Sequence, residues 1–175
     1  MERSLALDVA YLGVAEPGDG VAGTEFTQCV DVDTVTFNFS DAKELSFTSM
    51  GHEDPWAVVS QKGDPSSIEF TIPSPTSDEM KMFCGGTVSG DKWEAPLSTP
   101  SILKTIRLQS LPYQGKFTEY VFVKCSVFGK ISQAPDKENC DLLLVKATIM
   151  TPVSAAGKQA SPYSRAVKAV SEDTE

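Results

Sequence analysis

The chain has little of what enzyme and metal sites usually require. Its 175 residues include one histidine, His52, and four cysteines with no CxxC pair. Zinc ligands mostly come in closely spaced Cys and His pairs, so a zinc site is not expected. His52 stands beside Glu53 and Asp54, but hard-cation loops supply more carboxylates at staggered spacing. No nucleophile elbow accompanies it either. The sequence therefore predicts no enzyme activity, no cofactor and no bound metal.

Basic residues and long apolar runs are also scarce. Lys plus Arg number 15 against 24 Asp plus Glu, which gives a net charge of −9. Binding to nucleic-acid phosphates needs clustered cations, whereas an acidic wall lets DNA pass because like charges repel. The same charge keeps a protein soluble. Residues 1–18 hold only a short apolar patch broken by Asp8 and Glu16, so we expect neither a signal peptide nor a membrane helix.

A protein made in the reducing cytoplasm is expected to keep its thiols free. Three of the four cysteines stand within or beside apolar runs, where a thiol packs as a small hydrophobe. We therefore expect structural thiols at Cys29, Cys84, Cys125 and Cys140.

What the sequence does hold is an alternation of apolar and polar residues, which is typical of half-buried β-strands. It occurs in residues 34–41, 43–50, 66–74 and 100–112. The fold class predicted from it is mainly β. We expect a β-sandwich or barrel of antiparallel strands with one short α-helix, completed by neighbouring subunits in a ring.

The last third of the chain predicts a long hairpin of residues 115–132 and 142–150. Strict alternation places Cys125 and Val127 on one face of the first strand and Phe122 on the other. Both strands are apolar on both faces, and such strands are covered on both sides. One short helix cannot supply that cover. We expect a second sheet and neighbouring subunits to provide it.

The helix is predicted after residue 76. Thr76 and Glu79 have the spacing of a capping box, and Gly85 suits the end of a helix. A helix of about two turns does not persist alone in water, so it must dock on the sheet. The side chains expected to dock are Met80, Phe83 and Cys84. Residues 87–95 then predict a hairpin that sets Val88 opposite Trp93.

The length suits one domain, and the composition changes near its end. Residues 1–152 are predicted to form the β domain. Residues 153–175 are rich in Ser, Ala and charge, with little apolar surface. We expect this C-terminal extension to be disordered in an isolated domain.

The order of the elements resembles a known family. A strand at "VAYLGV" precedes a Gly-rich loop, and paired strands follow around "VDTVTFNFSD" and "KELSFTSM". "IEFTIPSP" then leads into the short helix of "TSDEMKMFCGG". A final hairpin runs from "PYQGKFTEYVFVKC" to "LLLVKATIMTP". Over residues 5–152 this order is similar to that of the tail tube proteins of long-tailed bacteriophages, which share their fold with the tube proteins of contractile injection systems.

The resemblance implies a structural virion protein of the tail, assembled in the host cytoplasm. Six copies would form a ring, their sheets would join into one inner barrel, and stacked rings would conduct DNA without binding it specifically. Its partners would be further copies of itself, other tail proteins and, in a contractile tail, a sheath. The family places a loop that contacts the next ring where this chain has residues 50–67. The residues expected to make that contact are Trp56, Val58 and Val59.

The polar side of the early strands is our prediction for the lumen face: Thr34, Thr36, Asn38, Ser40, Glu44, Ser46 and Thr48. Two alternatives stay open. One is a monomeric β-sandwich module that binds a carbohydrate or a protein. The other is a different tail or neck component of related fold.

Overall fold

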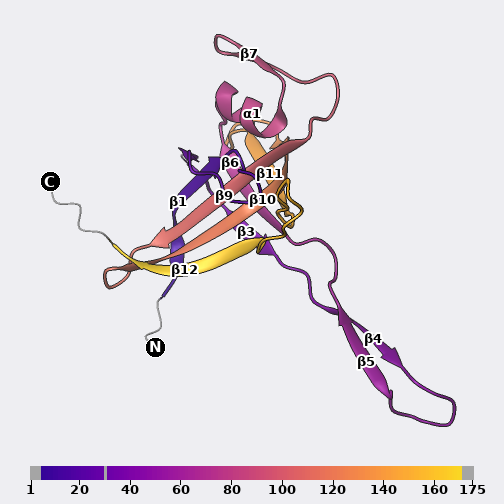
Figure 1. Cartoon of the computed structure of the whole chain (residues 1–175). Helices are drawn as coiled ribbons and strands as arrows, with labels where there is room; N and C mark the ends of the chain where they lie inside the picture. Colours follow the sequence, from indigo (N-terminus) through magenta and orange to yellow (C-terminus); the bar gives the residue numbers. More distant parts are fainter. Residues whose placement is uncertain (1–4, 30, 171–175) are drawn as a thin grey trace.

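A computed structural model describes residues 5–29 and 31–170 (Figure 1). In chain order the elements are β1 (Leu7–Ala15), β2 (Thr27–Gln28), β3 (Val35–Asn38), β4 (Lys43–Phe47), β5 (Ala57–Gln61), β6 (Ser67–Pro73), α1 (Ser77–Cys84), β7 (Thr87–Ser89), β8 (Lys92–Glu94), β9 (Ile102–Leu111), β10 (Lys116–Gln133), β11 (Leu142–Ile149) and β12 (Tyr163–Ala169). The prediction of a mainly β chain with one short helix is confirmed.

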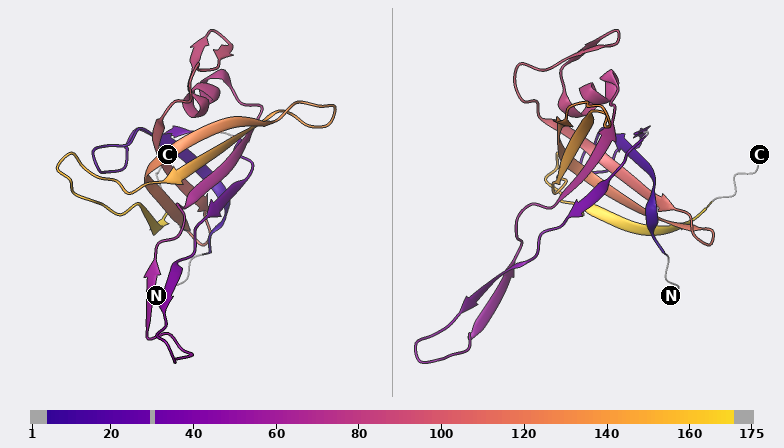
Figure 2. Two further views of the ribbon diagram at one scale, coloured as in Figure 1. Left: turned by 90° about the vertical axis from the view of Figure 1, so that its right-hand side faces the viewer. Right: turned by 180° about the vertical axis from the view of Figure 1, so that it is seen from behind.

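Eight of the strands form one antiparallel sheet. Its order is β2-β1-β9-β10-β11-β6-β3, and β12 also pairs with β10. The sheet curls around the core, as the views in Figures 1 and 2 show, but it is not closed into a barrel. The expectation of a barrel is therefore not met within one subunit. The pairs β4–β5 and β7–β8 are separate two-stranded hairpins.

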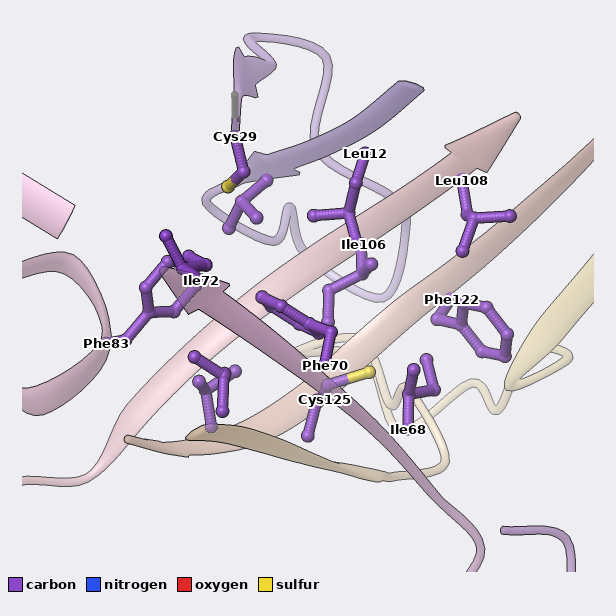
Figure 3. Packing of buried hydrophobic residues seen from close by; sticks show 14 of the residues in the cluster. Leu12, Cys29, Ile68, Phe70, Ile72, Phe83, Ile106, Leu108, Phe122 and Cys125 are labelled. Atoms are coloured by element: carbon purple, nitrogen blue, oxygen red, sulfur yellow. The ribbon is translucent and has the colours of Figure 1, made fainter. Parts of the chain in front are cut away.

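The core follows the alternation seen in the sequence. In β6, Ile68, Phe70 and Ile72 are all buried, as the period-two pattern predicts. Ile106 and Leu108 of β9 join them from across the curled sheet (Figure 3). Burying a side chain of this size contributes about 1.5–3 kcal/mol relative to leaving it exposed. One continuous cluster therefore holds the sheet in its curled form.

The long strand β10 departs from strict alternation. A register shift between Phe122 and Cys125 interrupts its pairing with β9. Phe122 and Cys125 are both fully buried, so the prediction that they lie on opposite faces is wrong. An extra residue in one strand moves all later side chains to the other face. The irregularity thus lets both halves of β10 contribute to one core.

The helix and its docking are as predicted. The side chain of Thr76 accepts from the backbone of Glu79, and the carboxylate of Glu79 accepts from the backbone of Thr76. Met80 and Phe83 are buried, and Cys84 packs partly buried against the core. The ring of Phe83 meets that of Phe70 edge-on at 5.6 Å. The hairpin β7–β8 likewise pairs Val88 with Trp93, as expected.

The C-terminal extension differs from its prediction. Residues 163–169 form β12, which pairs with residues 116–122 of β10. Disorder is therefore wrong for this part, although residues 171–175 lie outside the described residues. Tyr163 stacks on Phe122 with ring centroids 5.7 Å apart. The ring contact and the backbone hydrogen bonds with β10 stabilise β12, although the segment has few apolar side chains.

Candidate assembly surfaces

The most prominent surface feature is a hairpin that leaves the body. Strands β4 and β5, with the connecting residues 48–56, form what we call the arm, residues 43–61. It projects on the side opposite α1 in Figures 1 and 2. The sequence predicted a strand at 43–50 followed by a loop over 50–67. Instead the supposed loop contains β5, which pairs with β4, and β3 pairs with β6.

The arm has one apolar face and one polar face. Cross-strand pairing sets Leu45 opposite Val59 and Phe47 opposite Ala57 on the apolar face. Glu44 and Ser60 are paired on the polar face. A two-stranded hairpin standing alone is at best marginally stable in water. Because the arm contacts chiefly itself, its apolar face lacks the cover that usually stabilises such a hairpin.

The tip of the arm exposes large apolar side chains. Met50 is fully exposed and Trp56 is 73% exposed, with Phe47 the ring nearest to Trp56, at 6.2 Å. Val58 and Val59, the other predicted contact residues, are also exposed. The three predicted residues thus lie on one projecting element, but Val59 points to its apolar face and Val58, paired with Ser46, to the opposite face. Sequence reasoning missed Met50 and Phe47, although their position in an apolar alternation would have indicated them.

A groove lies at the other end of the molecule. It has a volume of about 410 Å³ and runs between α1, the hairpin β7–β8, residues 96–100 and the end of β10. Trp93 forms part of its wall and is fixed by donating its indole N–H to the carbonyl of Gly85 at 2.8 Å. Leu97, Phe128 and Ile131 line it with exposed apolar side chains. No sequence pattern indicated this groove, because its walls come from four separate segments.

Strand β12 offers a free edge. One edge pairs with β10, and no pairing along the other edge is present within the described residues. All seven of its residues are exposed. A free edge is a row of unpaired backbone donors and acceptors that a strand of another chain can complete. Strand β3 ends the path of the same sheet and is paired there only to β6.

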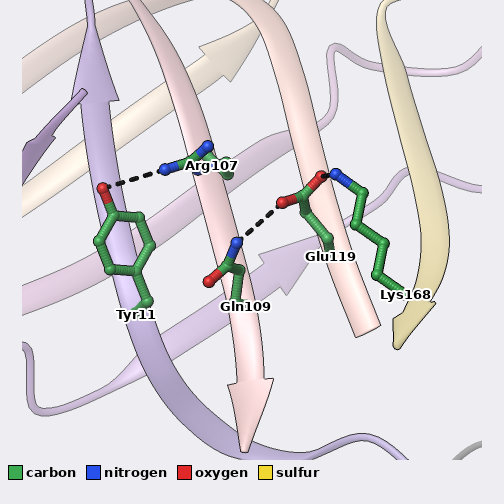
Figure 4. Close-up of polar contacts among 5 residues, drawn as sticks. All are labelled: Tyr11, Arg107, Gln109, Glu119 and Lys168. Carbon is green, nitrogen blue, oxygen red and sulfur yellow. Dashed lines mark hydrogen bonds and ion pairs between the residues drawn. The ribbon is translucent and has the colours of Figure 1, made fainter. Parts of the chain in front are cut away.

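The sheet face opposite the core carries a row of polar side chains (Figure 4). Arg107 donates to the hydroxyl of Tyr11 at 3.3 Å, and Gln109 donates to Glu119 at 2.8 Å. Lys168 of β12 completes the row through an ion pair of 2.5 Å with Glu119. These contacts tie β1, β9, β10 and β12 together. They also fasten β12 to the body at a point where it buries little apolar surface.

Glu119 is the electrostatic centre of this row, and it is 6% exposed. Burial raises its pKa, but the hydrogen bonds from Lys168 and Gln109 and the charges of Lys168 and Arg107 outweigh it. The net result is a pKa below the usual carboxyl value. A carboxylate held in this way stabilises the fold while it is ionised.

The residues predicted for the lumen do not form one face. Thr36 and Asn38 are exposed on β3, opposite the core-facing Val35 and Phe37. Thr34 is exposed just before that strand, and Ser40 is half-buried two residues after it. The remaining three lie on or next to the arm, away from the main sheet: Glu44, Ser46 and Thr48. Their assignment to a lumen stays a prediction.

The thiols differ in environment. Cys29 and Cys125 are buried, and burial raises the pKa of each to about 12. Burial also raises the pKa of Cys84, whereas Cys140 is exposed. Over residues 5–29 and 31–170, no group of three or more His, Cys, Asp and Glu side chains could hold a metal ion. In the same part of the chain, no helix is long and apolar enough to cross a membrane.

A scan against protein-family models and a search of curated proteins find no match to this chain.

Proposed function

We propose that this chain is a structural subunit of a bacteriophage tail tube. Copies assemble into rings, with six per ring as the resemblance implies, and the rings stack into a tube that conducts DNA. The observation that carries the proposal is the arm. It is a projecting hairpin whose apolar face and tip have no cover within the described chain.

The size of the arm's exposed apolar surface supports an assembly role. Single exposed apolar residues are normal on a protein surface, but a contiguous group marks an interaction site. Phe47 and Val59 lie on the apolar face of one hairpin, with the ring of Trp56 beside that of Phe47 and Met50 fully exposed in the connecting turn. Tryptophan is enriched among the few interface residues that contribute most of the binding energy, so Trp56 suits the centre of a contact.

The free sheet edges support ring formation. Strand β12 has an unpaired edge within the described residues, and β3 ends the strand order of the same sheet. Main-chain pairing between such edges would join the sheets of neighbouring subunits, and a heterologous contact of this kind closes into a ring when its rotation allows. The net charge of −9 suits a wall past which DNA slides without binding.

A second candidate function has one observation in its favour. The groove beside Trp93, at about 410 Å³, falls within the range of about 300–1,000 Å³ typical of small-molecule sites. A monomeric binding module would use it for a ligand. The arm would then have no role, which is why we place this candidate second.

Negative-stain electron microscopy of the purified protein, concentrated and incubated, tests the proposal. Rings or hollow tubes of constant width are the expected result. A different tail or neck component would give single rings or closed oligomers that do not grow into tubes. A monodisperse monomer, even after seeding with preformed tail-tip complexes, would overturn the proposal and favour the binding module.

A further inference from the structure

Two apolar surfaces lie at opposite ends of this molecule, and their chemistry matches. We propose that the groove formed by α1, β7–β8 and the end of β10 receives the tip of the arm of a second copy. The inference rests on the proposed function and extends it by naming the receiving site. It commits to one occupant, namely residues 48–56 with the apolar face of β4–β5.

The apolar parts of the two surfaces correspond. The tip presents Met50 and Trp56 as its most exposed side chains. The groove presents Leu97, Phe128 and Ile131, all exposed in the free subunit, around a partly buried Trp93. Each surface is costly to leave in water and each is removed from water by the other.

The charges of the two surfaces are complementary. Beside the apolar residues, the tip carries Glu53 and Asp54, which are exposed and have no ion pair with any described residue. Among the described residues that line the groove, Lys130 is the one with a charge. Lys130 is exposed and likewise has no ion pair in the described chain. Opposite charges at the rim of an apolar contact set its orientation and speed its formation.

The placement of the two surfaces decides what kind of assembly results. The arm and the groove lie at opposite ends of the subunit in all three views (Figures 1 and 2), so the arm does not fold back into its own groove. A contact between two different patches is heterologous and repeats from copy to copy, whereas a two-fold dimer would use one patch twice. A heterologous contact closes into a ring or continues as an open stack, depending on the rotation between copies. Because the arm and the groove lie at opposite ends of the subunit, the arm-in-groove contact adds copies along the line that joins these ends. That is the direction in which rings would stack.

Site-directed cross-linking tests the inference. Two proteins are made in a Cys84→Ala, Cys140→Ser background, because Cys84 is only partly buried and lines the groove. One carries Met50→Cys and the other Leu97→Cys, and the two have different affinity tags. After mixing, assembly and mild oxidation, we expect a disulfide-linked heterodimer that contains one copy of each. Neither protein alone should give that product. Val21→Cys is the matched control for Leu97→Cys, because Val21 is 61% exposed and lies on another loop.

Charge exchange provides a second test that needs no cysteine. Lys130→Glu should raise the concentration needed for assembly by up to about fivefold, the range of a rim ion pair. Glu53→Lys should do the same, and the double variant should return toward the original value.

The outcomes separate this inference from the proposed function. Tubes that form without the heterodimer, or that cross-link equally well through Val21→Cys, would overturn the arm-in-groove contact and leave the tube intact. Two single charge variants whose effects simply add would also count against it. Failure of the unmodified protein to assemble under any condition would overturn both.

Discussion

Replacing Trp56 and Val59 together with Ser is the most direct test of the arm, because Val59 lies on its apolar face. In the free subunit both side chains are exposed, Trp56 by 73% and Val59 by 47%. The backbone N–H of Trp56 donates to the carbonyl of Phe47 at 2.9 Å, and Ser keeps that bond. Surface substitutions of this kind change the free energy of unfolding by about 0.5 kcal/mol or less. The variant subunit should therefore fold normally.

The same change should be severe for assembly. Truncating a tryptophan at the centre of a contact costs about 2–4 kcal/mol, and losing a fully buried Val side chain costs about 1.5 kcal/mol. A sum near 4 kcal/mol weakens each contact on the order of a thousandfold. We expect unchanged thermal unfolding but no tubes in pelleting assays or electron micrographs at concentrations where the original protein assembles.

A matched control is Val21→Ser, which removes a comparably exposed apolar side chain from another loop. It should assemble at nearly the original concentration. If the arm variant formed tubes of full length at the original concentration, the assignment of the arm to a subunit contact would be wrong.

Four further predictions follow from the packing and the charges. Phe83→Ala should lower the free energy of unfolding by about 3–5 kcal/mol, measured by urea denaturation, because the side chain is fully buried and its loss leaves a cavity under α1. The depressed pKa of Glu119 stabilises the fold at neutral pH. That contribution should be lost as the pH falls below the usual carboxyl range and through the lower folded value, and Glu119→Gln should flatten this part of the stability profile. At neutral pH a maleimide should label Cys140 much faster than the three thiols whose pKa is raised by burial, as mass spectrometry of labelled peptides would show. Backbone amides of the arm should exchange with deuterium quickly in the free subunit and slowly in tubes, and equal rates in both states would contradict docking.

The local parts of the fold could be predicted from the sequence. The alternation of Ile68, Phe70 and Ile72 defines a strand and its buried face, and both are confirmed. The capping box of Thr76 and Glu79 fixes the start of the helix within the chain itself. Such features depend on residues a few positions apart in the chain, so the local periodicity or the spacing of two residues is enough to predict them.

The non-local parts could not be predicted in this way. The irregularity in β10 between Phe122 and Cys125 arises in its pairing with β9. The alternation of apolar residues in the sequence does not reveal it. The pairing of β4 with β5 was missed because both partners are short and separated by a long turn, residues 48–56. Strand β12 has almost no apolar signal, since a ladder and an ion pair hold it in place. Trp56 could be singled out from the sequence because a tryptophan stands out in a polar segment, and its role in a contact stays a prediction.

In the proposed tube, the cost of ordering the arm would affect when subunits assemble. An isolated two-stranded hairpin gains little from its own pairing, and fixing the backbone of each residue costs about 1–2 kcal/mol in conformational entropy. Any part of the arm that is loose in the free subunit must be ordered when it docks, and that cost is subtracted from the gain of burying Trp56 and its neighbours. A first contact is therefore weak, whereas a subunit that joins an existing ring can add sheet-edge contacts through β12 or β3 at the same time. In the proposed tube, this difference would favour growth from a preformed end over spontaneous nucleation.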